Sequence, residues 1–119
     1  MKSLIAALTL ALLSTAALAE SGTCSASANG QRLRVNFTGN LTGGEGVVLL
    51  NGRVISRFER GEARINLLNQ SMSGRNGYGD VVRARVTNIV DGSGLVEQLT
   101  IPSADIDWRN VPVYCTLYP

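Results

Sequence analysis

The sequence predicts an all-β domain, and three observations support this fold class. Apolar and polar residues alternate with a period of two over most of the chain after residue 20. Asn-Gly and other glycine-containing turn signals separate the alternating runs at short intervals. One cysteine stands near each end of this region, at Cys24 and Cys115. We therefore expect a small antiparallel β-sandwich of the immunoglobulin-like type, with about seven strands and closed by one terminal disulfide; a small β-barrel is the alternative.

The first 19 residues have the three parts of a secretory signal peptide. Met1 and Lys2 form a charged start, residues 4–13 an apolar run, and Ala17-Leu18-Ala19 a small-residue cleavage site. The apolar run is shorter than the roughly 18 residues of a membrane-spanning helix, and no later run is as long. We therefore expect a signal peptide over residues 1–19, a single domain over residues 20–119, no membrane span, and a periplasmic or secreted protein.

The two cysteines predict a structural disulfide. Export delivers a chain to an oxidising compartment, where Cys24 and Cys115 are expected to pair. A redox pair or a thiolate metal site is the alternative. The cysteines lack C-x-x-C spacing, however, and the chain has no histidine to complete a zinc site. We therefore expect neither a metal nor a cofactor.

The first two hairpins are predicted from Asn-Gly turns, which supply the positive φ angles of a type I′ turn. The first turns at Asn29-Gly30 and pairs Cys24 with Val35, so that Cys24 faces the interior. Its inward residues are Cys24, Ala26, Leu33, Val35 and Phe37. The second turns at Asn51-Gly52, with Val47, Leu49, Val54 and Phe58 expected inward. Its opposite face, with Val48, Leu50 and Ile55 beside Arg53 and Arg57, is too apolar for a freely solvated surface, so we expect it to be covered or to bind a partner.

The rest of the chain continues the period-two pattern. Residues 62–69 read as a strand with Ala63, Ile65 and Leu67 inward, whereas the glycine-rich residues 39–46 and 70–79 are expected to be loops. A third hairpin spans residues 80–101, turns at residues 91–94 and places Val90 opposite Leu95. Its expected inward residues are Val82, Ala84, Val86, Val90, Leu95, Leu99 and Ile101, with Val96 outward. A final strand over residues 111–117 points Cys115 inward.

Composition argues against catalysis and against nucleic-acid binding. The absence of histidine removes the commonest general base, and the cysteines are expected to be oxidised. Residues 20–119 carry ten arginines against nine acids, a net charge of +1. A nucleic-acid footprint requires a concentrated basic excess, usually with stacking aromatics. We therefore expect a protein that is not an enzyme and does not bind nucleic acid.

Outward-facing arginines are the best candidates for a binding site. They lie on the predicted outer faces of the hairpins, at Arg32, Arg34, Arg53, Arg57, Arg83 and Arg85. If these strands are neighbours, the arginines and the apolar patches between them form a surface suited to contact with another exported protein or with an acidic polymer. The alternative is a solvated face on which arginines shield sheet edges against aggregation.

Other motifs are weaker. Asp105 and Asp107 stand beside Trp108 and permit a paired-carboxylate or calcium site, although two acids in a loop are ordinary composition. The triplets that begin at Asn36, Asn40 and Asn69 match the N-glycosylation motif, which also occurs by chance.

Three functions follow from these observations. The leading hypothesis is an exported, non-catalytic protein-interaction module, a monomer or weak oligomer that serves as an inhibitor, chaperone-like accessory or assembly factor. The second is a structural subunit of a surface fibre, suggested by the alternating last strand with Tyr118 near its end. The third is a small carbohydrate- or calcium-binding domain that uses Asp105, Asp107 and Trp108.

Overall fold

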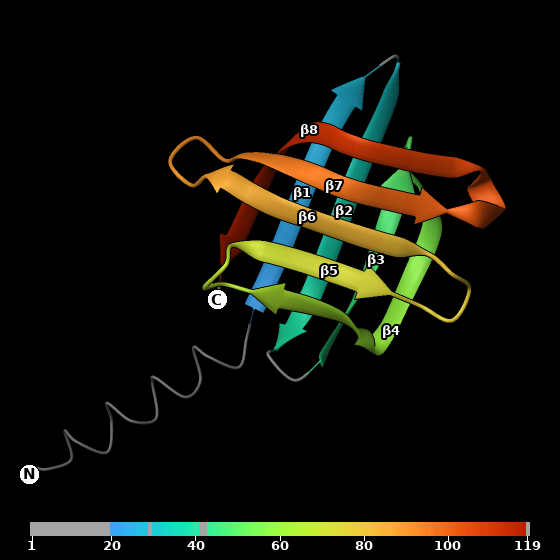
Figure 1. Ribbon diagram of the computed structural model, residues 1–119, viewed down its shortest axis with the longest axis horizontal. Coiled ribbons are helices and arrows are strands. Elements are labelled where there is room, and N and C mark those ends of the chain that lie inside the picture. Colours follow the sequence, from blue (N-terminus) through green and yellow to red (C-terminus); the bar gives the residue numbers. More distant parts are fainter. Residues whose placement is uncertain (1–19, 29, 41–42, 119) are drawn as a thin grey trace, which may run out of the picture.

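The computed structural model describes residues 20–28, 30–40 and 43–118, and these form an all-β fold of eight antiparallel strands (Figure 1). The strands are β1 (Glu20–Ala28), β2 (Gln31–Asn40), β3 (Gly43–Leu50), β4 (Arg53–Asn66), β5 (Ser71–Arg75), β6 (Val81–Asn88), β7 (Ser93–Ile101) and β8 (Ile106–Tyr118), with the 3-10 turn η1 (Pro102–Ala104) before β8. Each strand pairs with the next, and β8 pairs with β1, so the sheet is a closed barrel. The alternative prediction, a small β-barrel, therefore fits the structure better, and the predicted β-sandwich is wrong. The predicted signal peptide, residues 1–19, lies outside the described residues.

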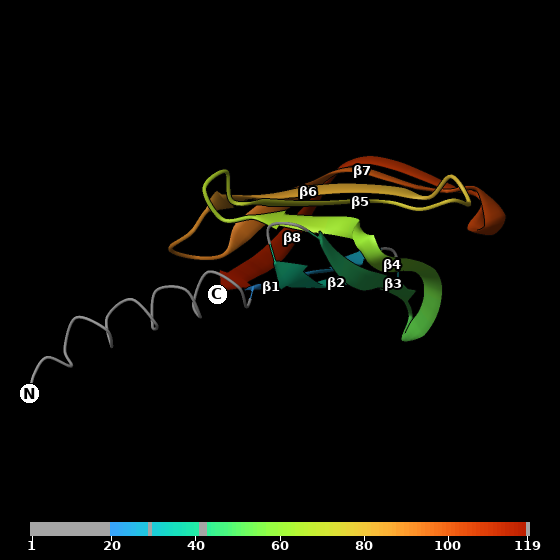
Figure 2. The same ribbon diagram turned by 90° about the horizontal axis from the view of Figure 1, so that it is seen from below.

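The barrel is flattened into two layers whose strands cross steeply (Figures 1 and 2). The first layer holds β1, β2, β3 and the start of β4; the second holds β5, β6, β7 and the start of β8. β4 pairs with β3 through residues 53–58 and with β5 through residues 63–66. β8 pairs with β7 through residues 106–114 and with β1 through residues 114–118. These two strands thus form corners that join the layers, as in orthogonal sheet packing.

A bulge turns β4 from one layer to the other. In the β3–β4 ladder, the pair Gly46–Phe58 is followed by the pair Gly44–Ala63. Residues 59–62 of β4 therefore have no partner in β3. Gly61 has a φ of +94° at this point, a conformation that glycine adopts without strain. Beyond the bulge Ala63 and Ile65 are buried as predicted, and Leu67 packs against the core, although the strand ends at Asn66 and not at residue 69.

The barrel interior is filled by side chains from both layers. The buried hydrophobic residues are Cys24, Leu33, Val35, Phe37, Val48, Phe58, Ala63, Ile65, Met72, Val82, Ala84, Val86, Val96, Leu99, Ile101, Ile106, Val113 and Cys115. Phe37 and Phe58 meet edge to face at its centre, with ring centroids 5.5 Å apart. A Cβ on Gly74 would lie 2.9 Å from the Phe37 ring, and a Cβ on Gly46 would overlap it.

These close approaches explain two errors in the sequence-based prediction. The glycine-rich residues 39–46 and 70–79 were expected to be loops, yet β3 begins at Gly43 and residues 71–75 form β5. Glycines on the inner face of these strands leave the space that the phenylalanine rings occupy. Glycine in a strand can therefore mark close packing, although the same residue also signals a turn.

The first two hairpins agree with the prediction near their turns. Cys24 opposes Val35 as expected, and Gly30 has a φ of +76°, whereas Asn29 lies outside the described residues. The second turn at Asn51-Gly52 has φ angles of +54° and +81°.

Beyond that second turn the register shifts, so that Val48 opposes Ser56. The shift places Ile55 in a bulge, so that Val54 before the bulge and Phe58 beyond it lie on opposite faces of the sheet. The predicted inward face is wrong for Val47, Leu49 and Val54, which lie on the outer side, and Val48 is buried instead. Phe58 is buried as predicted. Leu50 and Ile55 pack against the core.

The predicted register of the third hairpin is also wrong. Asn88 opposes Ser93 and Arg85 opposes Leu95, so the turn spans residues 89–92. Val90 is 91% exposed instead of inward, and Val96 is buried instead of outward. The carboxamide of Asn88 accepts a hydrogen bond from the backbone N–H of Val90, which starts the turn early.

The predicted disulfide between Cys24 and Cys115 is confirmed. The two residues oppose each other in the β1–β8 ladder, and both are buried. The disulfide therefore crosses the seam that closes the barrel. Cys115 faces inward as expected, although the last strand begins earlier than predicted, at Ile106.

Candidate functional site

The outer face of the first layer carries a continuous row of side chains across five strands. Arg34 on β2 opposes Leu49 on β3 in one direction and Ser25 on β1 in the other. Leu49 in turn opposes Val54 on β4, and Ser25 opposes Tyr114 on β8. Polar, cationic, aliphatic and aromatic side chains thus meet on one surface.

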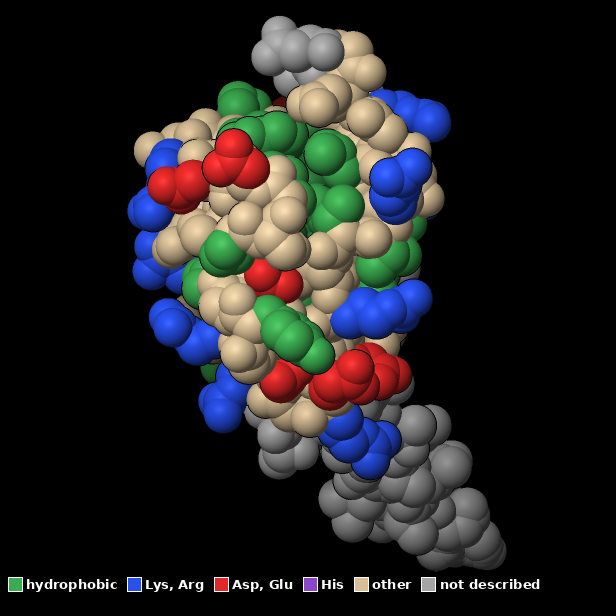
Figure 3. All heavy atoms as spheres, turned by 90° about the vertical axis from the view of Figure 1, so that its right-hand side faces the viewer, with side chains coloured by type: hydrophobic (Ala, Val, Ile, Leu, Met, Phe, Trp, Pro, Cys, Tyr) green, Lys and Arg blue, Asp and Glu red, His purple; other side chains and the backbone are tan. Residues whose placement is uncertain are grey.

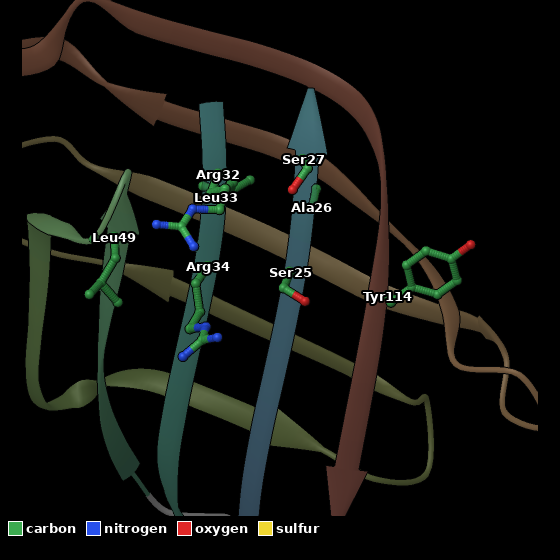
Figure 4. A pocket seen from close by; sticks show the side chains of 9 residues that line it. Ser25, Ala26, Ser27, Arg32, Leu33, Arg34, Leu49 and Tyr114 are labelled. Carbon is green, nitrogen blue, oxygen red and sulfur yellow. The ribbon is translucent and has the colours of Figure 1, made fainter. Parts of the chain in front are cut away.

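A hollow of about 540 Å³ lies on this face, and we call it the β1 trough (Figure 4). It is lined by Ser25, Ala26, Ser27, Arg32, Leu33, Arg34, Leu49, Gly52 and Tyr114. Ser25 and Ser27 lie along β1, with Arg32 and Arg34 on one side and Tyr114 on the other (Figure 4). The β1 side chains that line it are small, and larger side chains from β2, β3 and β8 complete the lining.

The trough is cationic. None of its described lining residues is acidic, and neither Arg32 nor Arg34 forms an ion pair with a described residue. Tyr114 is 68% exposed, so its ring is available for contact. Tyrosine and arginine are enriched at protein interfaces because each combines a large apolar body with hydrogen-bonding groups.

A neighbouring turn fixes the Arg32 end of the trough. The Asn51 side chain accepts a hydrogen bond from the Arg32 backbone N–H at 2.8 Å, and the Asn51 backbone N–H donates to the Arg32 carbonyl at 2.7 Å. Asn51 adopts a positive φ of 54°, which asparagine tolerates better than most residues. The β3–β4 turn is therefore tied to β2 beside the site.

The structure divides the six arginines that the sequence singled out. Arg32 and Arg34 line the trough, and Arg53 and Arg57 lie exposed on β4 in the same layer. Arg83 and Arg85 lie exposed on β6, in the second layer. Viewed from the end of the barrel, arginine side chains accordingly line both flanks of the molecule (Figure 3). They form two separate surfaces and not one.

Sequence reasoning missed Tyr114, Ser25, Ser27 and Leu49 as parts of this site. A usable signal existed, because an antiparallel disulfide pair between Cys24 and Cys115 places Ser25 opposite Tyr114. The role of Leu49 depends on the register shift beyond the Asn51-Gly52 turn, which local periodicity does not indicate.

The acidic candidates, Asp105 and Asp107, have different surroundings. Asp105 follows η1 with a φ of +56°, while Asp107 lies on β8 and accepts hydrogen bonds from Thr100 and Arg109. Trp108 packs against the core. Within residues 20–28, 30–40 and 43–118, no three His, Cys, Asp or Glu side chains come together as metal ligands.

A buried polar cluster lies where the residue 76–80 loop meets β4. Asp80 is 4% exposed, and its Oδ2 atom accepts hydrogen bonds from the Ser56 hydroxyl at 2.7 Å and the Asn76 amide at 3.0 Å. The Asn76 amide also donates to the Arg57 carbonyl at 2.8 Å. The other carboxylate oxygen of Asp80 has no partner among the described groups. The cluster attaches the loop to β4.

The opposite end of the barrel exposes large apolar side chains. Leu68 in the β4–β5 turn and Ile89 and Val90 in the β6–β7 turn all project into solvent. Ile89 and Val90 border a hollow of about 450 Å³ that Leu117 also lines. Exposed apolar groups of this kind can serve as contacts with a partner, so this end competes with the trough as a binding surface.

Comparison of the chain with protein-family models, with curated proteins and with solved structures finds no match in any of the three. In the part of the chain that the structure describes, no helix is long and apolar enough to cross a membrane.

Proposed function

We propose that the protein is an exported, non-catalytic protein-interaction module that contacts its partner through the β1 trough. The observation that supports this proposal is the trough itself, where two arginines without ion-pair partners among the described residues stand across β1 from an exposed tyrosine. An inhibitor, a chaperone-like accessory or an assembly factor would each use such a surface. The disulfide is compatible with export.

The chemistry of the trough defines the complementary surface on the partner. Arg32 and Arg34 favour carboxylates, because a guanidinium donates two parallel hydrogen bonds to a carboxylate. Leu49 and Tyr114 favour apolar or aromatic side chains between those charges. We therefore expect an acidic partner surface with an apolar centre.

The closed barrel gives less support to the fibre-subunit hypothesis. Each described strand has a neighbour on both sides, and the ladder between β1 and β8 completes the ring. A subunit that receives a strand from its neighbour needs a free sheet edge. The trough instead offers side chains on a sheet face, which suits a folded partner.

Affinity capture followed by a binding measurement tests this proposal. The tagged protein is incubated with its own exported fraction, cross-linked through carboxylates because residues 20–119 contain no lysine, and the recovered protein is identified by mass spectrometry. The Kd for that protein is then measured for the wild type and for Arg32→Ser/Arg34→Ser. We expect the double variant to weaken binding about tenfold or more, the scale of an interface anchor.

Two matched variants locate the contact. Arg64→Ser/Arg83→Ser removes two exposed arginines from the second layer, and Ile89→Ser/Val90→Ser removes the apolar turn. Both should leave the Kd unchanged. If affinity falls with either of these and not with Arg32→Ser/Arg34→Ser, the trough is not the contact surface.

A further inference from the structure

The second layer carries an arginine cluster of its own. Among the described residues its outer face bears Arg64 on β4, Arg75 on β5, Arg83 and Arg85 on β6, and Arg109 on β8. Arg85 pairs with Glu97 at 2.7 Å and Arg109 pairs with Asp107 at 3.1 Å. The remaining arginines, Arg64, Arg75 and Arg83, have no ion-pair partner in the described part of the chain.

The strand register brings these three arginines around one small residue. Ser73 on β5 opposes Arg64 on one side and Arg83 on the other. Arg75 lies two residues farther along β5 and therefore on the same face as Ser73. Since adjacent strands are about 4.8 Å apart, the backbones of Arg64 and Arg83 are only roughly 10 Å apart, with Ser73 between them.

A hollow of about 370 Å³ lies over this residue, and we call it the Ser73 hollow. All three arginines line it, as does one acid, Glu62. The Glu62 carboxylate accepts a hydrogen bond from the Glu59 backbone N–H at 2.6 Å, which holds it to the β4 bulge. Three positive charges therefore face one negative charge, and the local charge is +2.

We propose that the Ser73 hollow binds a tetrahedral oxyanion, a phosphate or sulfate group. Guanidinium groups bind such anions through paired, charge-assisted hydrogen bonds. A carboxylate has only two oxygen atoms to share among the arginines, whereas a phosphate or sulfate group presents three or four. The hydroxyl of Ser73, which also lines the hollow, adds a further donor. This site lies on the opposite layer from the β1 trough and does not depend on the proposed function.

Titration of the purified protein tests the proposal directly. Amide chemical shifts are recorded by NMR while sodium phosphate, sodium sulfate, glycerol 3-phosphate or sodium acetate is added at constant ionic strength with sodium chloride. We expect saturable shifts around Ser73 with phosphate and sulfate, and weaker ones with acetate. Glycerol 3-phosphate distinguishes a free ion from a phosphate group carried on a larger molecule. Binding of glycerol 3-phosphate shows that the site accepts a carried group. Binding of the inorganic ions alone shows a site for the free ion.

Variants of the lining residues supply the second part of the test. Arg64→Gln/Arg83→Gln should weaken phosphate binding more than tenfold, because hydrogen bonds to charged groups are lost. Arg32→Gln/Arg34→Gln removes the same number of charges from the first layer and should leave phosphate binding unchanged. Ser73→Ala keeps all charges and should weaken it less. Equal shifts in phosphate and chloride, equal affinity for acetate, or an unaffected Arg64→Gln/Arg83→Gln variant would overturn the proposal.

Discussion

Several strand glycines of this barrel face its interior and lie where a side chain would collide with the core. The Phe37 ring occupies the space beside Gly46 and Gly74, and the Cys115 sulfur lies 2.8 Å from the position of a Cβ on Gly94. A Cβ on Gly22 would lie 2.7 Å from Leu117. Glycine thus allows large side chains and the disulfide to fit inside a small barrel at close-packed density.

Gly74→Ala tests this role of the glycines. The new methyl group would lie 2.9 Å from Phe37 and 3.0 Å from Phe58, so both rings must move. We expect the free energy of unfolding in urea to fall by about 1–3 kcal/mol, the usual cost of overpacking. Gly77→Ala is the matched control, because nothing lies within 4 Å of its Cβ position. Equal stability of the two variants would show that the core is loose around Phe37.

Ser56→Ala tests the buried polar cluster. The substitution removes the 2.7 Å hydrogen bond to Asp80 and leaves that buried carboxylate with fewer donors. We expect a loss of about 1–3 kcal/mol in the free energy of unfolding, the cost of an unsatisfied buried polar group. Ser103→Ala, at an exposed position in η1, should have no measurable effect. A neutral Ser56→Ala would mean that Asp80 does not depend on this serine.

At the scale of the elements, the alternation of apolar and polar residues predicts the inward side chains of a hairpin correctly where the strands contain no bulge. The first hairpin is correct because its strands oppose each other without a shift from Cys24 to the turn. In the second, the extra residue Ile55 reverses which side chains face inward. Alternation alone does not indicate such an insertion, because the hairpin has an apolar face to bury both with and without the extra residue.

For the candidate site too, the sequence predicted which side chains face outward and did not predict which strands lie together. Alternation correctly identified Arg32 and Arg34 as outward residues. Their separation from Arg83 and Arg85 follows from the corner in β4, which depends on contacts between distant strands. Tyr114 joins the trough because β8 returns to β1, and the signal for that return in the sequence is the neighbouring Cys115, which pairs with Cys24.

The β6–β7 turn provides a prediction about pH. Hydrogen bonds from the Ser93 hydroxyl and backbone N–H lower the pKa of Asp91 below its ordinary value. The folded turn therefore favours the ionised carboxylate, and this contribution is present above the ordinary pKa and is lost as the pH falls through the lowered one. In an NMR titration, we expect the Ser93 amide shift to move with a midpoint below the usual range for aspartate.

Asp91→Asn and Asp91→Ala complete that experiment. Asparagine keeps an acceptor oxygen, so its variant should retain the turn and show no titration of the Ser93 amide. Alanine removes the acceptor and should increase hydrogen exchange at Ser93. A titration that persists in both variants would assign the effect to another group.

At the scale of the whole molecule, closure decides the fold. A sandwich and a flattened barrel have the same period-two pattern within each strand, so local sequence does not separate them. The distinction lies in β4 and β8, each of which pairs in both layers and leaves no open seam among the described strands. The cysteines were the one long-range signal in the sequence, and they correctly joined the first strand to the last.

Removal of that disulfide tests how far the stability of the barrel depends on closure between β1 and β8. Cys24→Ala/Cys115→Ala releases a link between residues 91 positions apart, which enlarges the unfolded ensemble relative to the native state. We expect the free energy of unfolding in urea to fall by about 2–5 kcal/mol. A non-thiol reductant should lower the stability of the wild type to a similar level and leave the variant unchanged.

The same variant connects closure with the candidate site. Ser25 and Tyr114 directly follow and precede the two cysteines, so fraying of the β1–β8 ladder would widen the trough between them. Partner binding should therefore weaken in Cys24→Ala/Cys115→Ala even under conditions where the protein remains folded, whereas phosphate binding at the Ser73 hollow on the second layer should not change. Wild-type stability and affinity in this variant would show that hydrogen bonds and core packing hold the seam closed without the disulfide.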